Sequence, residues 1–363
     1  MSKERPKILL SGGGTGGHVF PALAIADEIH KLRPHADILF VGTANKIEAR
    51  VIPQRGYAFS TIWISGLRRK VTLENLLFPL KVFVSMIQSF FLMKQFQPDV
   101  VVGTGGYVCG PVLYTASLLG VPTVVHESNS YPGVTTRMIA GRATRVLTAF
   151  EGTNRWLKKT NNVQLVGTPV RESLAKMPRN EAMKYFGLQP GVKTLLVFGG
   201  SLGATSINNA VRGIFRDLEQ SQIQVIWQTG EKDYDSLRSF AGQRVWVGAF
   251  IERMDYAYAA ADVVLCRAGA MTIAELTALG KPAILVPYPF AAADHQTYNA
   301  LMLAKAGAAI ALADHDLSSK LKETVLNVLK DDSKKKKMAA ASQSLGKHEA
   351  GRVIAETILE LAG

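Results

Sequence analysis

The chain has 363 residues, 47% of them hydrophobic and 20% charged, which is enough for two domains with full cores and typical of a soluble α/β protein. Its two cysteines exclude a disulfide scaffold and a cysteine metal site, so we expect Cys109 and Cys266 to be inert buried thiols in a reducing compartment. The net charge of +13 favours an anionic partner, but the absence of a nucleic-acid-reading motif argues against nucleic acid.

Apolar, strand-like runs alternate with helix-like runs along the whole chain. This alternation predicts an α/β fold with doubly wound parallel sheets covered by helices on both faces. In the first half we expect strands at residues 7–11, 37–41, 57–63, 99–103, 122–126, 144–148 and 163–166. In the second half we expect them at residues 194–198, 223–228, 244–248, 262–266, 282–286 and 308–311. Because the N-terminal residues lead directly into a strand, we expect no signal peptide.

Two prolines mark a division of the chain. Pro169 and Pro178 break regular structure between the last strand of the first half and the next helix. We therefore predict two Rossmann-like domains, residues 1–168 and 169–346, that face one another across a cleft at the carboxyl ends of both sheets, where ligands of open α/β sheets bind. The last helix, within residues 347–363, has no following strand, and we expect it to pack back on the first domain.

A glycine-rich loop follows the first strand of each half. The first is Gly12–Gly17, followed by His18, and the second is Gly199–Ala204. Glycines let the backbone approach a ligand closely, and the helix that follows directs its free N–H groups and the positive end of its dipole toward that ligand. The two loops therefore predict phosphate or diphosphate binding in both domains.

The first loop permits two other interpretations. Gly12, Gly14 and Gly17 match the G-x-G-x-x-G pattern of nicotinamide and flavin sites. Such a site needs an acidic residue at the end of the second strand to bind the ribose hydroxyls, whereas Asp37 precedes this strand and no carboxylate follows it. A tight strand-to-helix turn without a ligand is the structural alternative. The additional glycines and the terminal His18 argue against both interpretations.

Further polar motifs follow later strands at the same predicted edges. These motifs are residues 103–111, 126–129, 267–275 and 287–299. Glu275 lies one turn into a predicted helix, where its carboxylate could bind two ribose hydroxyls; an acid that pairs with the helix dipole is the alternative. Ser201, Thr272 and the adjacent backbone amides could together bind a diphosphate.

The segment Leu73–Phe96 is apolar nearly all round its predicted helix. Charged residues and Pro79 interrupt it, and a membrane span needs roughly 20 apolar residues, so we do not expect it to be transmembrane. A core helix is apolar along one stripe only. Two interpretations stay open: an ordinary buried helix, or a helix that enters the membrane interface while Arg68–Lys70 bind anionic headgroups.

Several motifs that would be weak alone together carry a family resemblance. They are Gly13–His18 with Pro21-Ala22, Gly105–Val108 with Gly110-Pro111, His126–Asn129, Val166–Arg171, Gly199–Ala204, Arg267–Glu275 and Asp294–Ala300. Over essentially its whole length, the chain resembles the MurG family of N-acetylglucosaminyltransferases. These are GT-B fold enzymes that complete the lipid-linked disaccharide precursor of peptidoglycan.

The resemblance implies an inverting transfer of N-acetylglucosamine from UDP-N-acetylglucosamine. The acceptor would be the C4 hydroxyl of the muramyl sugar in undecaprenyl-pyrophosphoryl-N-acetylmuramyl-pentapeptide, so that lipid I becomes lipid II. The resemblance also implies a peripheral position on the cytoplasmic face of the bacterial plasma membrane.

The resemblance further implies a set of donor-binding residues. They are Thr15, Gly16, Gly17, Asn129, Arg171, Ser201, Ile251, Ala270, Met271, Thr272, Glu275 and Gln296. Some family members carry a second Gln where this chain has Thr297, so a sugar contact at this position stays open. We expect the acceptor diphosphate to contact Gly13, Gly14, Thr104, Gly105, Gly106 and Tyr107.

The transfer needs a base for the acceptor hydroxyl and stabilisation of the departing UDP. His18 suits the first role because histidine titrates near working pH, and Glu127 is the rival base. A residue that only orients the loop is the alternative role for His18. The helix start at residues 199–204, with Arg171 and Ser201, is expected to stabilise UDP.

No metal or other cofactor is expected. Asp233 and Asp235 form a D-x-D pattern, which binds metal-diphosphate in another glycosyltransferase fold, but they lie at a predicted helix start, where acids are common. The run Lys334–Lys337 is expected to be a solvated charged face. Two other classes of function are a UDP-N-acetylglucosamine 2-epimerase of the same fold and a non-catalytic scaffold that binds a sugar nucleotide.

Overall fold

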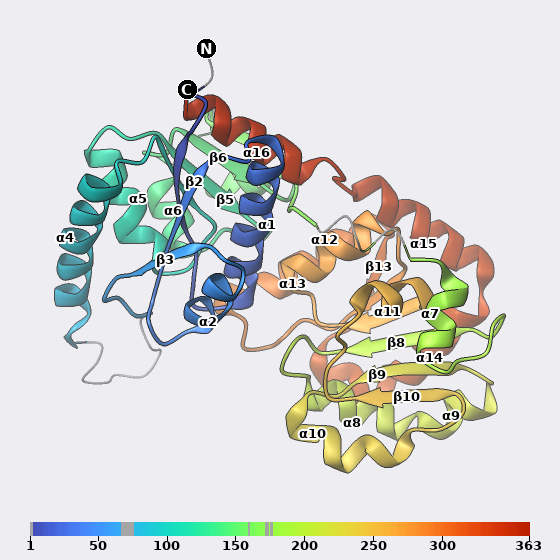
Figure 1. The fold of residues 1–363 in the computed structure, drawn as a ribbon. Coiled ribbons are helices and arrows are strands. Elements are labelled where there is room, and N and C mark those ends of the chain that lie inside the picture. The colour runs from blue at the N-terminus through green and yellow to red at the C-terminus, as the bar shows by residue number, and fades with distance from the viewer. Residues whose placement is uncertain (1–2, 67–75, 159, 171–173, 175–176) are drawn as a thin grey trace. The chain divides into compact units, whose positions relative to one another are not determined.

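The computed structural model describes residues 3–66, 76–158, 160–170, 174 and 177–363. The chain folds into two compact units, Met1–Pro169 with His348–Gly363 and Val170–Lys347. Each unit is built on its own parallel sheet covered by helices, which is a Rossmann-like arrangement (Figure 1). The predicted fold class is confirmed, whereas the cleft expected between the two domains stays a prediction.

Among the described residues, the first unit contains a seven-stranded parallel sheet with the order β3-β2-β1-β4-β5-β6-β7. Its strands are β1 Lys7–Ser11, β2 Asp37–Gly42, β3 Ala58–Thr61, β4 Val100–Gly103, β5 Thr123–Glu127, β6 Arg145–Thr148 and β7 Val163–Leu165. Each strand starts within one residue of its predicted start. The edge strand β3 ends two residues before its predicted end. The N–H of Ile64 donates to the carbonyl of Ile62, which closes a tight turn in place of a further pair with the neighbouring strand.

The helices of the first unit lie on both faces of this sheet. They are α1 Gly16–Leu32, α2 Ile47–Gln54, α4 Phe78–Phe96, α5 Cys109–Leu118, α6 Val134–Ile139 and α16 Ala350–Leu361, with a 3-10 turn η1 at Thr153–Trp156. Successive residues of a strand point to opposite faces. Ile8 and Leu10 of β1 therefore pack with α1, α2 and α16, whereas Leu9 packs with α5 and α6.

The C-terminal helix α16 completes one of these layers. Ile354 and Ile358 are fully buried in the same core as β1, and the helix packs along α1 (Figure 1). The close approach requires Gly351, because a Cβ there would lie 2.9 Å from the side chain of Glu28.

The second unit repeats the architecture with a six-stranded parallel sheet, again among the described residues, in the order β10-β9-β8-β11-β12-β13. The strands are β8 Thr194–Phe198, β9 Gln224–Gln228, β10 Val245–Gly248, β11 Val263–Cys266, β12 Ala283–Leu285 and β13 Ala309–Ala311. The helices are α7 Arg179–Tyr185, α8 Thr205–Gly213, α9 Phe215–Gln220, α10 Glu231–Leu237, α11 Met254–Ala260, α12 Ala270–Ala278, α13 His295–Lys305, α14 Leu317–Lys330 and α15 Asp332–Leu345. Short 3-10 turns are η3 Arg238–Phe240, η4 Ala292–Asp294 and η5 Asp314–Asp316.

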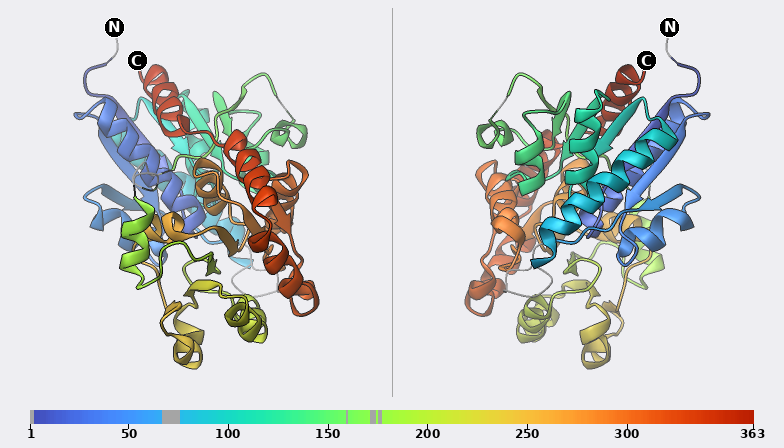
Figure 2. Two further views of the ribbon diagram at one scale, coloured as in Figure 1. Left: turned by 90° about the vertical axis from the view of Figure 1, so that its right-hand side faces the viewer. Right: turned by 90° about the vertical axis from the view of Figure 1, so that its left-hand side faces the viewer.

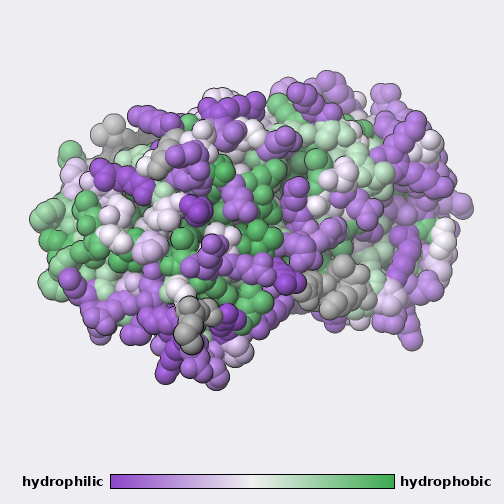
Figure 3. Space-filling model, turned by 90° about the horizontal axis from the view of Figure 1, so that it is seen from above, coloured by the Kyte–Doolittle hydropathy of each residue, from purple (hydrophilic) through white to green (hydrophobic). Residues whose placement is uncertain are grey.

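The helix α4 differs from the other helices of the first unit in what it exposes. Its small residues Ser85 and Ser89 are buried, whereas Phe83 and Phe91 are 63% and 64% exposed. The helix packs against α5 and lies at the front of the unit in the right-hand view of Figure 2. Apolar residues gather at the left edge of the surface in Figure 3, where α4 lies. No helix in the described part of the chain is long and apolar enough to cross a membrane.

Candidate active site

Each sheet has one point at which the strand order reverses. In the first unit it lies between β1 and β4, and in the second between β8 and β11. Crevices at the carboxyl ends of strands beside such a point bind the ligands of open α/β sheets. The four loops that follow these strands contain the two glycine loops and the motifs at residues 103–111 and 267–275, whereas residues 126–129 and 287–299 follow the next strands, β5 and β12. Each unit therefore has one candidate site.

The two glycine loops of the first unit are bonded to each other. Ser11 pairs with Gly103 at the ends of β1 and β4, and the N–H of Thr104 donates to the carbonyl of Ser11 at 2.9 Å. The Thr104 hydroxyl donates to the backbone carbonyl of His18 at 2.8 Å. Thr104 is buried and therefore acts as the link between the loops rather than as an open ligand contact.

Glycine is required where the second loop passes the first. Gly105 and Gly106 have φ values of +112° and +86°, which L side chains rarely adopt. A Cβ at Gly105 would collide with the imidazole of His18, and a Cβ at Gly106 would collide with the carbonyl oxygen of Gly13. The two glycines thus permit a close approach that places the second loop against the imidazole.

His18 lies in the first turn of α1, which begins after the exposed residue Thr15. Its Nδ1 is 3.1 Å from the carbonyl oxygen of Thr104. Because a carbonyl only accepts hydrogen bonds, this contact assigns the proton of the neutral imidazole to Nδ1 and makes Nε2 the basic nitrogen. Gly16 and Gly17 precede His18 in the same turn, where the N–H groups of a helix start are directed outward.

Glu127, the rival base, is buried and holds the loop that follows β5. Its Oε1 accepts from the backbone N–H and the side-chain amide of Asn129 at 3.0 and 3.1 Å. Its Oε2 accepts from the N–H of Gly133 at 2.9 Å and from the hydroxyl of Thr136 at 2.7 Å. A carboxylate offers about four lone-pair positions, and four donors occupy this one. The geometry favours a role in shaping the loop and in orienting Asn129.

The neighbouring His126 is a core residue. Its ring is fully buried, with Nε2 2.9 Å from the carbonyl of Gly167 and Nδ1 3.3 Å from the hydroxyl of Ser128. Burial lowers the pKa of His126 below its ordinary value, against the opposing effects of the Gly167 carbonyl and Glu127. The two histidines of the predicted motifs in this unit therefore have different surroundings.

Glu48 is a buried residue of this site that the sequence analysis did not identify. It lies in the first turn of α2, and its Oε2 accepts from the N–H of Gly14 at 3.1 Å. Its Oε1 accepts from the N–H and the hydroxyl of Thr43 at 3.2 and 2.7 Å. A Cβ at Gly13 would lie 2.5 Å from the same carboxyl group. Glu48 therefore holds the first glycine loop from behind and occupies the Gly14 amide.

The two cysteines are buried, as the sequence predicts. Burial raises the pKa of Cys109 to about 11, against the hydrogen bond that its thiol donates to the Ser11 carbonyl. Burial also raises the pKa of Cys266. A thiolate is the reactive form of cysteine, and a raised pKa disfavours the thiolate, so neither residue is activated as a nucleophile.

The glycine loop of the second unit packs against the end of β9 and the loop that follows it. Gly203 has a φ of +75° and packs so closely on the carbonyl of Thr229 that no Cβ would fit. The side-chain amide of Gln228 donates to the carbonyl of Gly200 at 2.9 Å. Ser201 is exposed within this loop, and the helix α8 begins four residues later.

The loop after β11 leads into α12 beside that glycine loop, since β8 and β11 are paired. Ala270, Met271 and Thr272 form the first turn of α12 and are partly exposed. Glu275 lies one turn further, and its Oε2 accepts from the hydroxyl of the buried Tyr258 at 2.8 Å. This hydrogen bond orients the carboxylate.

The remaining donor candidates vary in exposure. The side-chain oxygen of Gln296, in α13, accepts from the N–H of Tyr288 at 2.9 Å, which ties the loop after β12 to that helix. Thr297 donates its hydroxyl to Asp294 at 2.7 Å. Ile251 is buried. Arg171 lies outside the described residues.

Arg267, at the end of β11, is a second residue that the sequence analysis left without a role. Its guanidinium donates to Ser206 at 2.8 Å and pairs with Asp314, and it also bonds the carbonyls of Val286 and Pro287. Mostly buried, it connects the loops after β11 and β12 to α8. The sequence signal was its position directly after a buried strand, but the partners lie up to 61 residues away.

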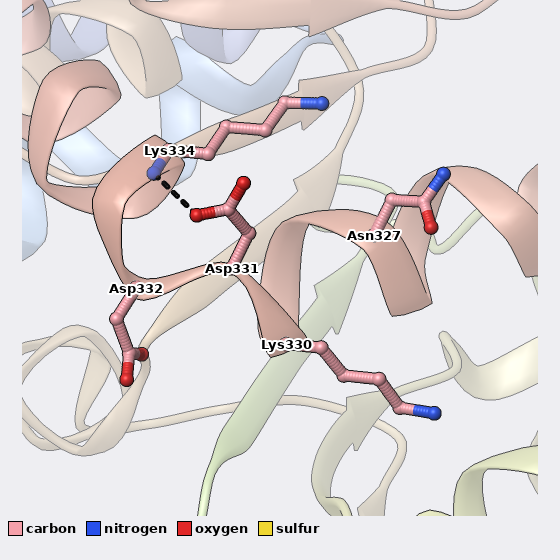
Figure 4. Close-up of a pocket in the computed structure, with 5 residues that line it drawn as sticks. All are labelled: Asn327, Lys330, Asp331, Asp332 and Lys334. Atoms are coloured by element: carbon pink, nitrogen blue, oxygen red, sulfur yellow. Dashed lines mark hydrogen bonds between the residues drawn. The ribbon is translucent and has the colours of Figure 1, made fainter.

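Asp233, one of the two acids weighed for metal binding, and Asp331, beside the lysine run, have structural roles. Asp233 accepts from the side-chain amide of Asn208 at 2.8 Å in the first turn of α10. No group of three or more His, Cys, Asp or Glu in the described ranges is arranged to hold a metal ion. A cavity of about 640 Å³ beside α14 and α15 is shown in Figure 4. There Asp331 caps α15 by accepting from the N–H of Lys334 at 2.9 Å, and the amino groups of Lys330 and Lys334 point away from it.

Two Rossmann-like units with a glycine loop at each switch point are typical of the GT-B fold, and the family matches show that the chain is a glycosyltransferase. Residues 8–148 match the Glycosyltransferase family 28 N-terminal domain, and residues 194–357 match the Glycosyltransferase family 28 C-terminal domain. Among solved structures, the chain is similar to MurG of Acinetobacter baumannii, with a TM-score of 0.79, 28% identity and coverage of 98% of this chain and 99% of the other.

Two relatives that match over nearly their whole length identify the family more closely. The chain is 41% identical over 361 residues to the UDP-N-acetylglucosamine--N-acetylmuramyl-(pentapeptide) pyrophosphoryl-undecaprenol N-acetylglucosamine transferase of Flavobacterium psychrophilum, covering 99% of this chain and 98% of the relative. It is 43% identical over 365 residues to the protein of the same name from Salinibacter ruber, covering 100% and 98%. The chain belongs to this family, the MurG glycosyltransferases.

For the epimerase alternative, the comparison shows a common fold alone. The UDP-GlcNAc 2-epimerase of Neisseria meningitidis, solved with UDP-GlcNAc bound, superimposes with a TM-score of 0.69 at 15% identity over 98% of this chain and all of that chain. Likeness at this level reports a common fold. The family relationship therefore favours sugar transfer over epimerisation.

Proposed function

We propose that the protein transfers N-acetylglucosamine from UDP-N-acetylglucosamine to the C4 hydroxyl of the muramyl sugar of undecaprenyl-pyrophosphoryl-N-acetylmuramyl-pentapeptide, which converts lipid I to lipid II in peptidoglycan synthesis. The observation that carries the proposal is the glycine loop at each of two switch points, one for each substrate, in a chain of the MurG family. Two anionic substrates also suit the net charge of +13.

The second unit binds the donor in this proposal. Backbone amides at the 199–204 loop and the first turn of α12 contact the diphosphate, assisted by Ser201 and Thr272. Glu275 binds the ribose hydroxyls, and its bond to Tyr258 supports the role because it fixes the carboxylate in one orientation. Gln296 and Arg171 complete the donor contacts from this unit, as their motif positions suggest.

His18 is the base of the proposed reaction. As the acceptor oxygen attacks the anomeric carbon, Nε2 takes the hydroxyl proton, the bond from that carbon to the UDP oxygen breaks, and UDP leaves with the electron pair. Attack from the opposite side inverts the α-linked donor to a β-linked product. The Nδ1 contact to Thr104 supports the assignment because it leaves Nε2 as the basic nitrogen. The four donors on Glu127 support a positioning role for that residue and for Asn129.

The first unit binds the acceptor diphosphate. Gly13, Gly106 and Tyr107 lie where the two glycine loops meet and are the proposed contacts. The amides of Gly14 and Thr104 bond to Glu48 and Ser11, which supports a role of these two residues in loop structure.

The acceptor's lipid calls for a membrane-facing surface, and we assign it to α4. The helix exposes Phe83, Ile87 and Phe91 along its outer side, and Leu76 and Leu80 are exposed at its start. Such a surface is larger than scattered single residues and marks an interaction site. Arg68–Lys70 and Leu73, which the sequence analysis joined to this segment, lie outside the described residues. The proposal places the protein peripherally on the cytoplasmic face of the plasma membrane.

No metal or other cofactor is part of the proposed reaction, because helix starts and backbone amides supply the stabilisation of the leaving diphosphate. The decisive experiment measures UDP release from UDP-N-acetylglucosamine with and without a polyprenyl-diphosphoryl-muramyl-pentapeptide acceptor, in the presence of a chelator. Release that depends on the acceptor supports the proposal. Epimerised sugar nucleotide, or no turnover with both substrates present, contradicts it.

A further inference from the structure

A polar pocket lies in the first unit beside the glycine loops. Its volume is about 570 Å³, within the usual range of ligand pockets. The loop after β2, the segment after β3 and residues Lys81 and Gln88 of α4 line it, and Tyr107 forms part of its wall. The lining residues that matter here are Thr43, Lys46, Trp63, Lys81, Gln88 and Tyr107.

The pocket has a cationic, aromatic lining. Lys46 and Lys81 are its charged residues, and none of its described lining residues is acidic. The amino group of Lys81 donates to the hydroxyl of Ser65 at 2.9 Å and lies 5.7 Å from the ring centroid of Trp63. These contacts hold the cation at the pocket wall, in front of an aromatic face. The combination suits a ligand that carries an anionic group together with apolar and amide groups.

The pocket is connected to the site of the proposed reaction. Tyr107 packs against both glycines that flank it, since a Cβ at Gly14 or at Gly66 would lie 3.0 or 3.1 Å from its ring. Thr43, in the pocket wall, bonds the same Glu48 carboxyl group that accepts from Gly14. A ligand in the pocket would therefore border the first glycine loop.

We propose that this pocket is a subsite for the peptide of the acceptor, in which Lys46 and Lys81 bind a peptide carboxylate. The inference rests on the proposed function, because it gives a binding site to the peptide, which is the part of the acceptor beside its sugar and its diphosphate. A pentapeptide carries a carboxylate, amide groups and side chains, which match the lysines, Gln88 and the aromatic rings. The pocket is larger than a phosphate requires, and its anion contacts are side chains rather than a nest of amides.

The test is a steady-state comparison of two acceptors with a short, water-soluble lipid, which removes the membrane from the assay. One acceptor has its free pentapeptide carboxylates, and in the other every peptide carboxylate is amidated. Lys81→Ala is expected to raise KM for the first acceptor about tenfold with kcat nearly kept, and to change KM for the second less than twofold. Lys46→Ala is expected to act in the same direction, and Lys81→Arg to restore most of the affinity.

Lys94→Ala is the matched control, because Lys94 is an exposed lysine of the same helix outside the pocket. It should leave KM for both acceptors unchanged. Equal KM increases for both acceptors would place the lysines on the shared diphosphate and overturn the subsite, as would an equal effect of Lys94→Ala. Transfer by the unchanged protein without discrimination between the acceptors overturns the subsite alone, whereas absence of transfer to either acceptor also overturns the proposed function.

Discussion

The glycine loops of the two units lie at equivalent switch points but are held by different means. In the first unit, side chains hold the loop: buried Glu48 accepts from the amide of Gly14, and Thr104 bonds both the preceding strand and the carbonyl of His18. Glu48 comes from the first turn of α2, and Thr104 comes from the loop after β4. The loop is therefore fixed from two sides.

In the second unit, close backbone packing does most of this work. Gly203 and Gly230 lie against one another's loops with no room for a Cβ, and Gln228 bonds a loop carbonyl. The difference follows from what each loop presents. A loop that aims one imidazole needs anchors near that ring, whereas a loop that presents amides to a diphosphate needs only a rigid backbone.

The largest expected effect tests whether the first loop positions His18 as the base. His18→Ala should lower kcat by about 10²–10⁴-fold with donor affinity nearly kept, because proton removal is lost and the donor loop is unchanged. Steady-state kinetics together with calorimetry of UDP binding measure both quantities. His35→Ala, an exposed histidine of the same unit, is the control. Loss of donor binding with kcat retained would make His18 a loop-orienting residue.

The next prediction breaks the anchor behind that loop. Glu48→Gln replaces one carboxyl oxygen by an amide group that faces donors at Gly14 or Thr43, so a buried hydrogen bond becomes a donor–donor contact. We expect a loss of about 1–3 kcal/mol in the free energy of unfolding, measured by denaturant titration, and a reduced kcat. UDP affinity should be unchanged because the second unit is untouched. Glu4→Gln, at an exposed position, should have no effect, and an equal loss there would contradict the assignment.

In the second unit, the corresponding test concerns Glu275. Glu275→Ala should weaken UDP binding by about 1.5–3 kcal/mol, as expected for a lost hydrogen bond to a charged group. Tyr258→Phe keeps the carboxylate and removes only its orienting partner, so it should weaken UDP binding less. Calorimetry measures both variants, with the exposed Glu231→Ala as control. Unchanged UDP affinity in Glu275→Ala would show that Glu275 has only a structural role, as the acceptor from Tyr258 and as an acid near the start of α12.

The exposed apolar surface of α4 assigns membrane binding to the first unit and not to the second. Replacing Phe83 or Phe91 by Ser should weaken binding to vesicles of anionic lipid by about 1–2 kcal/mol each, because an exposed ring loses its apolar burial in the interface. Neutralising Arg68, Arg69 and Lys70, or raising the salt concentration, should weaken it further by about 1 kcal/mol per charge. Sedimentation that does not depend on these residues, salt or lipid charge would contradict membrane binding by this surface.

Much of the fold was predictable because buried parallel strands are nearly continuous apolar runs. The end of β3 was not, since Ile62 and Ile64 continue the apolar run and are buried, yet the N–H of Ile64 bonds the carbonyl of Ile62 and not the neighbouring strand. The positions of the site loops followed from their glycines, and Gly105 and Gly106 have the positive φ values that such loops require.

The contacts that hold the site were not predictable in the same way. Glu48 bonds Gly14 across 34 residues, and nothing in the local sequence distinguishes it from any acid in the first turn of a helix. The pattern His126–Asn129 likewise selects Glu127 as a candidate base, but only the structure shows that four donors occupy its oxygens. Long-range hydrogen bonds depend on tertiary structure that a local motif does not encode.

The smallest expected effect concerns the pH dependence that the buried His126 gives to the stability of the first unit. Because burial holds the pKa of His126 below its unfolded value of about 6.5, the unfolded chain binds more protons as the pH falls below that value. The contribution of His126 is complete above pH 6.5 and is lost as the pH falls through its lowered native pKa. His126→Gln keeps a donor for the Gly167 carbonyl and does not titrate. Its free energy of unfolding, measured by denaturant titration at several pH values from 7 to 5, should therefore fall less steeply with acid than that of the unchanged protein. Parallel curves for the two proteins would show that His126 does not carry this pH dependence.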